Sequence, residues 1–427
     1  MNFGYYNILI IYALVFGLHL LIPSRITEGY VCNNEGVVLL YRLNGLIVSV
    51  VTCLMFHFIS SDDFKISLYD NYLQAFGLVN VLGILVSCYF VFWRQPVVIE
   101  KFSRCVTTDQ IEVEERTGRV EVRKDLKLGD PSVGLGARFF LGNEWNPRVL
   151  KPLLLPDMQR HQNHQHRELS AETRKPVTLA ARDGAGVDVK MFLYLVGAVG
   201  LQCVVLSCAY KQLALHGRCS RAMQVYMGGF AWFTLEYLLL EEVHLYTYDI
   251  FAEKIGFKLC WGCLAFYPFV YAVGAFPLVV SPLENDISSS TAGAIAVLFV
   301  VGWIVTRGSN LQKYYSKRDP TATSFLFGLV PQTKLPGTHL LVSGWWGVAR
   351  HFNYTGEILQ ALALALPGLL VGVSVADRAL ALMYPLYYVL LFVPRQYDDE
   401  AVCRVKYGDK WDEYVERVPW RMCPGVF

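Results

Sequence analysis

The chain has 427 residues, of which 54% are hydrophobic and only 17% are charged, and its formal net charge is +2. A soluble protein of this size usually carries about a quarter charged residues, so we expect lipid to surround much of this chain. Neither the net charge nor any Lys/Arg run indicates a nucleic-acid surface, and we expect no nucleic-acid partner.

Long apolar runs recur along the chain, each close to the roughly 20 residues that a helix needs to cross a bilayer. The first lacks the basic start and the cleavage site of a signal peptide, so we expect it to be retained. Because helices satisfy their own backbone polar groups in lipid, we predict an all-α polytopic membrane protein with about 8–10 transmembrane helices. The predicted spans are Tyr5–Pro23, Asn44–Ser60, Leu73–Trp93, Lys190–Tyr210, Ala222–Leu240, Gly256–Ser281, Ser290–Thr306, Thr355–Val375 and Arg378–Pro394.

Residues 94–187 are polar and rich in both charge signs, which predicts a long loop between spans. Within them, Arg160–His166 gathers histidines without paired Cys or carboxylate ligands, so we interpret it as a solvated segment. Cys260 and Cys263 have redox or zinc spacing but no second pair, and we expect no metal site.

The polar stretch Arg307–Gly337 carries five cations against one acid, Asp319, and the positive-inside rule places it in the cytosol. On a helix, Lys313 and Lys317 would share one face, where two cations suit a phosphate or pyrophosphate. A role in topology alone would also account for these cations.

Two further clusters combine ionisable and aromatic residues beside apolar runs, namely Leu340–Glu357 and Arg395–Tyr414. Ionisable residues at membrane depth are costly and usually serve a site, although Trp residues alone could be interface anchors and the second cluster a tail helix. Together the clusters offer cations for phosphates, aromatic rings, and Asp399 as an acceptor for a ribose or carboxamide. No G-x-G-x-x-G follows a predicted strand, so a Rossmann domain is not the binder.

The chain resembles the sterol reductases, the family of delta-14 sterol reductase, 7-dehydrocholesterol reductase, fungal delta-24(28) reductase and the membrane domain of the lamin B receptor. Leu340–Glu357 is similar to its L-L-x-S-G-W-W-G-x-x-R-H-x-N-Y-x-G-[DE] motif, and Asp399–Tyr414 to its D-E-x-x-C-x-x-K-Y-G-x-x-W-x-x-Y motif. Weaker matches are N-x-Q-K at Asn310–Lys313, G-x-E-x-N-P-R ending at Arg148, and Y-x-x-N-G-L at Tyr41–Leu46.

The resemblance implies a single membrane domain over residues 1–427, with an NADPH-binding part at 307–427. It implies NADPH as cofactor, a sterol substrate surrounded by membrane lipid, and a multi-pass protein of the endoplasmic reticulum whose cofactor site faces the cytosol. The positions that match cofactor contacts are Lys313, Lys317, Leu341, Trp346, Asn353, Tyr354, Asp399, Cys403, Arg404, Val405, Lys406, Tyr407 and Tyr414.

Some positions depart from the family pattern. Residues 149–187 look like an insertion, and Gly262-Cys263 stands where relatives have a Gly-Asp pair. The family's Arg-Pro-Gly is missing behind Asp188–Phe192. Lys317 replaces an Arg, which keeps the charge but loses the bidentate fork. The first three differences concern the substrate side of the family fold.

An isolated alkene accepts hydride poorly, so the expected reaction protonates the double bond before hydride arrives from the nicotinamide. The proton donor must be a positioned acid, and the candidates are Asp399 through a relay, Tyr414, His351 and Glu241. Burial and the adjacent Glu242 would both raise the pKa of Glu241. For each candidate, a structural hydrogen bond is the alternative role.

Several alternatives remain open. The amino-terminal motifs favour the delta-14 enzyme, whereas the Pro424–Phe427 ending is closer to the delta-7 enzyme, and a delta-24(28) reductase is also compatible. Isoprenylcysteine-type methyltransferases share an R-H-x-x-Y element but lack N-x-Q-K and the Trp pair. A sterol-binding scaffold should carry a soluble amino-terminal module, which we do not expect because the first span begins near Tyr5.

Overall fold

The computed structural model describes residues 4–32, 38–94, 134–142, 144, 146–149, 186–251 and 253–427. The chain forms two compact units, and each is described by itself. The first consists of Met1–Ser60, Asn71–Gly200 and Leu235–Pro268; the second consists of Ser61–Asp70, Leu201–Thr234 and Phe269–Phe427.

The first unit is mainly helical and also contains two short antiparallel ladders. Its helices are η1 (Gly4–Tyr6), α1 (Asn7–Leu21), α2 (Gly45–Phe58), α4 (Tyr72–Cys88), η2 (Tyr89–Trp93), α6 (Leu135–Leu141), α10 (Glu241–His244), α11 (Tyr248–Phe251) and α12 (Phe257–Trp261). In the ladders, β1 (Arg25–Cys32) pairs with β2 (Val38–Leu43), and β3 (Arg148–Val149) pairs with β4 (Val187–Asp188). Three helices pass from one unit into the other: α8 (Val189–His216), α9 (Arg221–Leu239) and η5 (Gly262–Val270).

Lys190 fixes the start of α8 within the first unit. Its side chain is fully buried, and its Nζ donates to the backbone carbonyls of Asp249 at 3.2 Å and Glu253 at 2.9 Å. Two residues earlier, Asp188 lies 3.3 Å from Nε of Arg148 and caps the backbone N–H of Met191. The D-x-K segment therefore connects the start of α8 to Arg148 and to the segment from Asp249 to Glu253. A buried cation needs such carbonyl partners.

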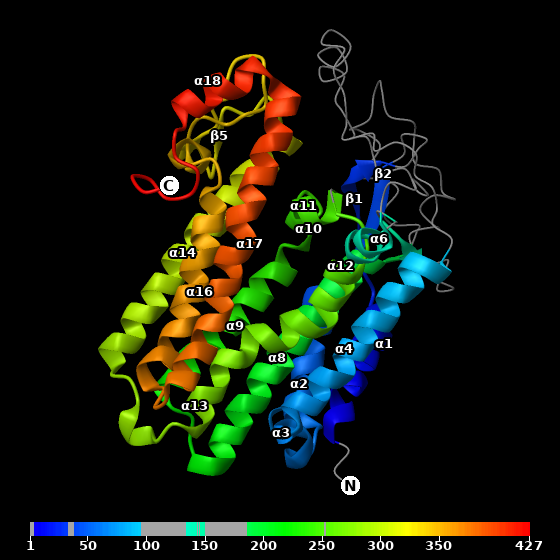
Figure 1. Cartoon of the computed structure of the whole chain (residues 1–427), viewed down its shortest axis with the longest axis vertical. Helices are drawn as coiled ribbons and strands as arrows, with labels where there is room; N and C mark the ends of the chain where they lie inside the picture. The colour runs from blue at the N-terminus through cyan, green and yellow to red at the C-terminus, as the bar shows by residue number, and fades with distance from the viewer. Residues whose placement is uncertain are drawn as a thin grey trace. The chain divides into compact units, whose positions relative to one another are not determined.

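The second unit is built around three long helices, α14 (Ser289–Arg318), α16 (Phe352–Val371) and α17 (Val375–Tyr407), which lie side by side (Figure 1). A Cβ at Gly302 would lie 2.8 Å from the backbone nitrogen of Gln360, so α14 and α16 touch through their backbones. The other elements are α3 (Asp62–Asp70), η6 (Tyr271–Ala275), α13 (Phe276–Val280), η7 (Leu283–Asn285), β5 (Ser324–Phe325), β6 (Val330–Pro331), α15 (Trp345–Val348) and α18 (Asp409–Arg417).

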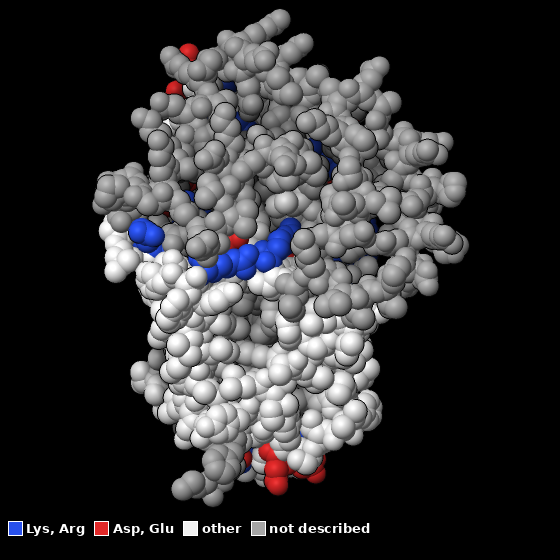
Figure 2. All heavy atoms as spheres, turned by 90° about the vertical axis from the view of Figure 1, so that its right-hand side faces the viewer, with Lys and Arg blue, Asp and Glu red and all other residues white. Residues whose placement is uncertain are grey.

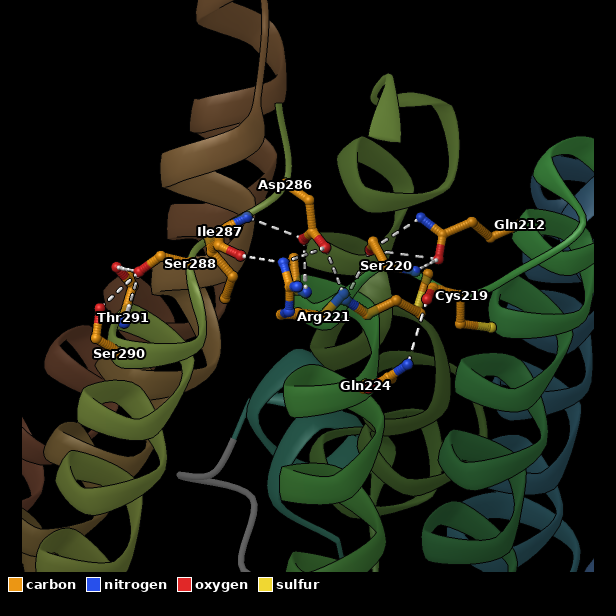
Figure 3. A network of polar contacts seen from close by, with 12 residues as sticks. Gln212, Cys219, Ser220, Arg221, Gln224, Asp286, Ile287, Ser288, Ser290 and Thr291 are labelled. Atoms are coloured by element: carbon orange, nitrogen blue, oxygen red, sulfur yellow. Dashed lines mark hydrogen bonds and ion pairs between the residues drawn. The ribbon is translucent and has the colours of Figure 1, made fainter. Parts of the chain in front are cut away.

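Polar side chains satisfy backbone groups at the start of α9 and in α13 within the second unit. Asp286 accepts from the backbone N–H groups of Arg221 at 2.7 Å and Ala222 at 3.1 Å, which caps α9 from outside (Figure 3). Gln212 of α8 donates to Ser220 and to the carbonyl of Leu278. These bonds satisfy backbone groups that helix termini leave open.

The described helices confirm a polytopic membrane protein. Seven are long and apolar enough to cross a bilayer, and an eighth span results if the bent pair Gly45–Phe58 and Asp62–Asp70 counts as one. The predicted span Ala222–Leu240 forms α9, which is not among these seven; polar residues such as Thr234 and Glu236 reduce its hydropathy. On the face in Figure 2, the described side chains form a broad area without Lys, Arg, Asp or Glu, bordered by a row of Lys and Arg.

The long polar stretch predicted at residues 94–187 is described only in part. Its described residues include helix α6 and strand β3, and Glu144 forms an isolated bridge with Ile255. The histidine cluster Arg160–His166 lies outside the described residues. Within the described ranges, no group of three or more His, Cys, Asp or Glu side chains is placed to hold a metal ion.

Candidate functional site

Gln312 of α14 organises the loop that carries the Trp pair. This fully buried side chain donates to the carbonyls of Pro331 and Ser343, each at 3.1 Å, and accepts from the backbone N–H of Trp345 at 3.0 Å. Gly344 has φ +62°, and a Cβ there would lie 2.5 Å from the Gln312 amide. A glycine is therefore needed where the loop passes this side chain.

Lys313 lies over the indole that this loop presents. Its Nζ is 4.8 Å from the centre of the Trp346 ring, a cation–π distance. The indole is held because its Nε1 donates to the carbonyl of Ser309 at 2.8 Å. Lys317 follows one helical turn later, as predicted from the spacing, because both residues lie on α14. The helix thus offers two cations one turn apart, the first of them over an aromatic ring.

Arg350 and Glu400 join the start of α16 to α17 and to the carboxyl-terminal segment. Nε of Arg350 donates to Glu400 at 2.8 Å, and its Nη1 donates to the carbonyls of Val418 at 2.7 Å and Pro419 at 2.9 Å. The second oxygen of Glu400 lies 3.3 Å from Nε of Arg421. With 4% and 12% exposure of their side chains, Arg350 and Glu400 form a buried ion pair.

His351 follows Arg350 and is buried. Burial, reinforced by nearby cations, lowers the pKa of His351 to about 3, so the imidazole is neutral at neutral pH. Its 3.8 Å separation from Glu400 is therefore a contact of a neutral ring, not an ion pair. The imidazole stacks on the ring of Tyr354, with centroids 5.4 Å apart and planes 8° apart.

Tyr354 and Asp399, two predicted cofactor positions, lie in direct contact. The hydroxyl of Tyr354 donates to Oδ2 of Asp399 at 2.8 Å, and its ring stacks on Phe392 with centroids 4.4 Å apart. The amide nitrogen of Asn353 donates to Asn310 at 3.3 Å. The buried amide oxygen of Asn353 has no hydrogen-bond partner in the described part of the chain. An orphaned acceptor here leaves room for a donor from a bound molecule.

The remaining predicted cofactor positions surround α18. Tyr414 is 3% exposed and packs in an apolar cluster with Leu335, Trp411 and Val418, against which Cys403 and Tyr407 also pack. Burial is the largest cause that raises the pKa of the Tyr414 hydroxyl above its ordinary value, so it stays protonated.

Three neighbouring predicted positions are open to solvent, and one is buried. Arg404 pairs with Asp412 at 3.2 Å on the surface, Lys406 lies 4.8 Å from the Tyr407 ring centre, and Val405 is 67% exposed. Leu341 is buried and forms a bridge with Lys334. These exposed cations suit contact with a phosphate-bearing molecule.

Glu241 belongs to the first unit, whereas the other three predicted acids belong to the second. It is 8% exposed, and burial raises its pKa to about 7. The backbone N–H of Gly45 donates to its Oε2 at 3.1 Å, which opposes this shift. The adjacent Glu242 pairs with Arg25 at 2.8 Å.

Sequence reasoning missed Gln312, Glu400 and Arg421 as parts of this site. Gln312 was visible inside the N-x-Q-K element, and Glu400 directly follows Asp399. Arg421 carried no signal, because only folding brings its Nε to Glu400 and its guanidinium 4.6 Å from the Tyr397 ring centre.

Comparison with known proteins places these motifs in one family. Residues 177–427, more than half of the chain, match the ergosterol biosynthesis ERG4/ERG24 family. A Delta(14)-sterol reductase of Methylotuvimicrobium alcaliphilum is 35% identical over 222 residues, which cover 52% of this chain and 50% of that protein. One of Arabidopsis thaliana is 34% identical over 241 residues, covering 56% and 62%.

A longer match extends over nearly the whole chain. The Delta(14)-sterol reductase ERG24B of Gibberella zeae is 27% identical over 452 aligned residues, which cover 97% of this chain and 83% of that protein. The matches to the first two relatives span only about half to three fifths of their lengths. The extent of the family match nevertheless decides membership. This chain belongs to the ergosterol biosynthesis ERG4/ERG24 family, the sterol reductase family that its two carboxyl-terminal motifs indicate.

Proposed function

We propose that this protein reduces a carbon–carbon double bond of a sterol with NADPH, and that the bond is delta-14. The observation that carries the proposal is the Tyr354–Asp399 hydrogen bond, in the same compact unit as Lys313 over Trp346. The name Delta(14)-sterol reductase, borne by all three relatives above, favours this bond over the delta-7 and delta-24(28) alternatives.

The residues of the second unit fit the chemical groups of NADPH. Lys313 and Lys317 would hold phosphates, and the Trp346 ring beside Lys313 offers a stacking surface. The orphaned amide oxygen of Asn353 and the carboxylate of Asp399 would accept hydrogen bonds from ribose or carboxamide groups. When bound, NADPH supplies a hydride. The chain's own task is to position the two reactants and to deliver a proton.

We propose that one of four residues donates the proton, and the surroundings of these four residues differ. Glu241 has a pKa of about 7 and is therefore partly protonated at neutral pH. Tyr414 keeps its proton, whereas His351 is neutral and holds only the N–H of the free base. Asp399 is bonded to the Tyr354 hydroxyl, and this pair would pass a proton from one group to the other.

We place the protein in the endoplasmic reticulum membrane with this site on the cytosolic side. The support is the basic end of α14, where Lys317 and Arg318 lie in the last turn. Sterol intermediates are lipids and reach such a site from the bilayer, whereas NADPH is charged and comes from water. A site on the cytosolic end of the second unit would give each reactant its own route.

A direct test uses the full chain purified in detergent, supplied with NADPH and one of three sterols bearing a delta-14, delta-7 or delta-24(28) double bond. Gas chromatography with mass spectrometry should detect reduction of the delta-14 sterol. Reduction of the delta-7 or delta-24(28) sterol instead would show that the protein is a sterol reductase that acts on that other bond. No reduction of any sterol, together with tight binding of S-adenosylmethionine, would favour the methyltransferase alternative.

A further inference from the structure

Gln396 of α17 is the starting point of a further inference. Its side chain has 0% exposure, and neither its amide nitrogen nor its amide oxygen has a hydrogen-bond partner among the described residues. Gln212 and Gln312, which are equally buried, each form three or more side-chain hydrogen bonds. Leaving a buried amide unpaired costs roughly 1–3 kcal/mol, a cost that a leucine of similar size would avoid.

The neighbours of Gln396 on α17 belong to the site described above. In a helix, residues four apart lie on one face, so Phe392, Gln396 and Glu400 form a single column. Phe392 stacks on Tyr354, and Glu400 binds Arg350. The unpaired amide therefore lies between an aromatic stack and a buried ion pair, both formed with residues 350–354. One helical turn towards the carboxyl end, Asp399 accepts from Tyr354.

The chemistry of the unpaired group limits what it can receive. A glutamine amide offers two N–H donors and one carbonyl acceptor, so a partner that satisfies it must both donate and accept. A primary carboxamide does so with two parallel hydrogen bonds, whereas a phosphate only accepts. An aromatic partner is also compatible with these neighbours, because the rings of Tyr354 and Phe392 stack on each other with planes 9° apart.

We propose that the amide of Gln396 binds the carboxamide of the nicotinamide ring and so selects the reactive end of the cofactor. This inference rests on the proposed use of NADPH. It adds a residue that neither motif nor resemblance indicates, because Gln396 lies outside the Asp399–Tyr414 motif. The phosphate and ribose groups would be bound by Lys313, Lys317 and Asn353.

The test measures binding, not turnover, with the full chain in detergent and isothermal titration calorimetry. Three probes are compared: NADP⁺, its 3-acetylpyridine analogue, in which a methyl ketone replaces the carboxamide, and 2′-phospho-ADP-ribose, which lacks the nicotinamide. The wild type should bind NADP⁺ about tenfold more tightly than the acetylpyridine analogue, since one hydrogen bond of the carboxamide is lost. In Gln396→Leu this ratio should fall to about one, while the affinity for 2′-phospho-ADP-ribose stays unchanged.

A matched control is Gln360→Leu on α16. Gln360 is 2% exposed; its amide nitrogen donates to Thr306 at 3.3 Å, and its amide oxygen, like that of Gln396, has no partner among the described residues. Because Gln360 lies on α16 and not in the column of α17, this variant should keep the tenfold preference. Equal affinity of the wild type for NADP⁺ and the acetylpyridine analogue would overturn the inference, and so would an unchanged ratio in Gln396→Leu. This first comparison needs no variant, so it can overturn the inference even if Gln396→Leu does not fold. Failure of the wild type to bind 2′-phospho-ADP-ribose would instead overturn the proposed cofactor itself.

Discussion

At the scale of single residues, buried polar side chains determine how this chain positions its site. Gln312 satisfies three backbone groups and thereby fixes the loop that holds Trp346, which in turn lies under Lys313. In the first unit, the buried Lys190 donates to the backbone carbonyls of Asp249 and Glu253 and so holds the segment around α11. Gln312 and Lys190 each have several hydrogen-bond partners. Loss of any one would leave a buried polar group unsatisfied, which costs free energy.

Asp399→Asn tests the assignment of the carboxylate that accepts from Tyr354. The change nearly preserves shape and removes the charge, and losing a charged hydrogen bond costs about 1.5–3 kcal/mol. We expect sterol reduction to fall roughly ten- to a hundredfold with normal expression. Initial rates and the yield of folded protein in detergent measure both quantities.

Tyr354→Phe is the matched control, because it removes the same bond from the other side and leaves the carboxylate in place. Its effect should be smaller than that of Asp399→Asn. Wild-type turnover by Asp399→Asn would contradict the assignment of Asp399 to the functional site. Loss of folding in that variant would make Asp399 a structural residue.

The buried Glu241 predicts a pH dependence of stability. Burial raises its pKa from 4.5 to about 7, so above pH 4.5 the unfolded chain releases a proton that the folded protein retains. Stability therefore falls as the pH rises from 4.5 to about 7, by on the order of 3 kcal/mol at most. Glu241→Gln cannot ionise, so its melting temperature should change less between about pH 5 and pH 8 than that of the wild type.

Glu242→Gln serves as the control for this measurement. Glu242 is partly exposed and pairs with Arg25, whose side chain is 65% exposed, so its loss should leave the pH dependence of the melting temperature in place. The account would be contradicted if the melting temperatures of the wild type and of Glu241→Gln changed equally with pH.

At the scale of elements, α14 and α16 approach each other through small residues. A Cβ at Gly356 would lie 2.4 Å from the hydroxyl oxygen of Thr306 and 2.6 Å from the carbonyl oxygen of Gly302. This contact fixes the two helices whose ends carry Lys313 and Asn353. Close backbone approach is a usual way for helices to associate in lipid, where burial of apolar surface supplies little driving force.

Gly302→Ala should therefore separate these helices and cost about 1–3 kcal/mol, with a lower melting temperature and weaker NADPH binding. Gly293→Ala on the same helix is the matched control, because nothing lies within 4 Å of the Cβ it would add. That variant should be neutral or slightly more stable, since alanine favours helices over glycine by up to about 1 kcal/mol. Equal melting temperatures for the two variants would show that the contact is unimportant.

The elements themselves were largely predictable from sequence, and their contacts were not. Apolar runs located the long helices because period and length suffice for a membrane helix. The run ending at Thr306 was predicted too short, since α14 continues with polar residues to Arg318. The ladder of β1 and β2 and the ion pair of Arg350 with Glu400 join residues whose proximity depends on tertiary packing. The motifs indicated most of the site residues, but not that Tyr354 bonds to Asp399.

At the scale of the whole molecule, the charge of the polar segments predicts the orientation in the membrane. In the second unit, Gln312 holds the Pro331–Ser343 region and Arg350 holds the carboxyl-terminal segment beside α17. We therefore expect Arg307–Gly337 and Arg395–Phe427 on one side, the cytosolic side. Single cysteines at the exposed positions Ser290, in the first turn of α14, and Phe327, beyond its end, should react with an impermeant reagent from opposite sides. Labelling of Phe327→Cys from the lumen would contradict this orientation.

The central claim is that hydride from NADPH and a proton from the protein saturate one sterol double bond. The most direct measurement follows both atoms by mass spectrometry of the sterol product. With NADPH deuterated at the hydride position, the product should gain one deuterium at one carbon of the former double bond. With ordinary NADPH in D₂O, it should gain one at the neighbouring carbon. A reduced sterol without deuterium from labelled NADPH, or a sterol left unreduced, would contradict the account.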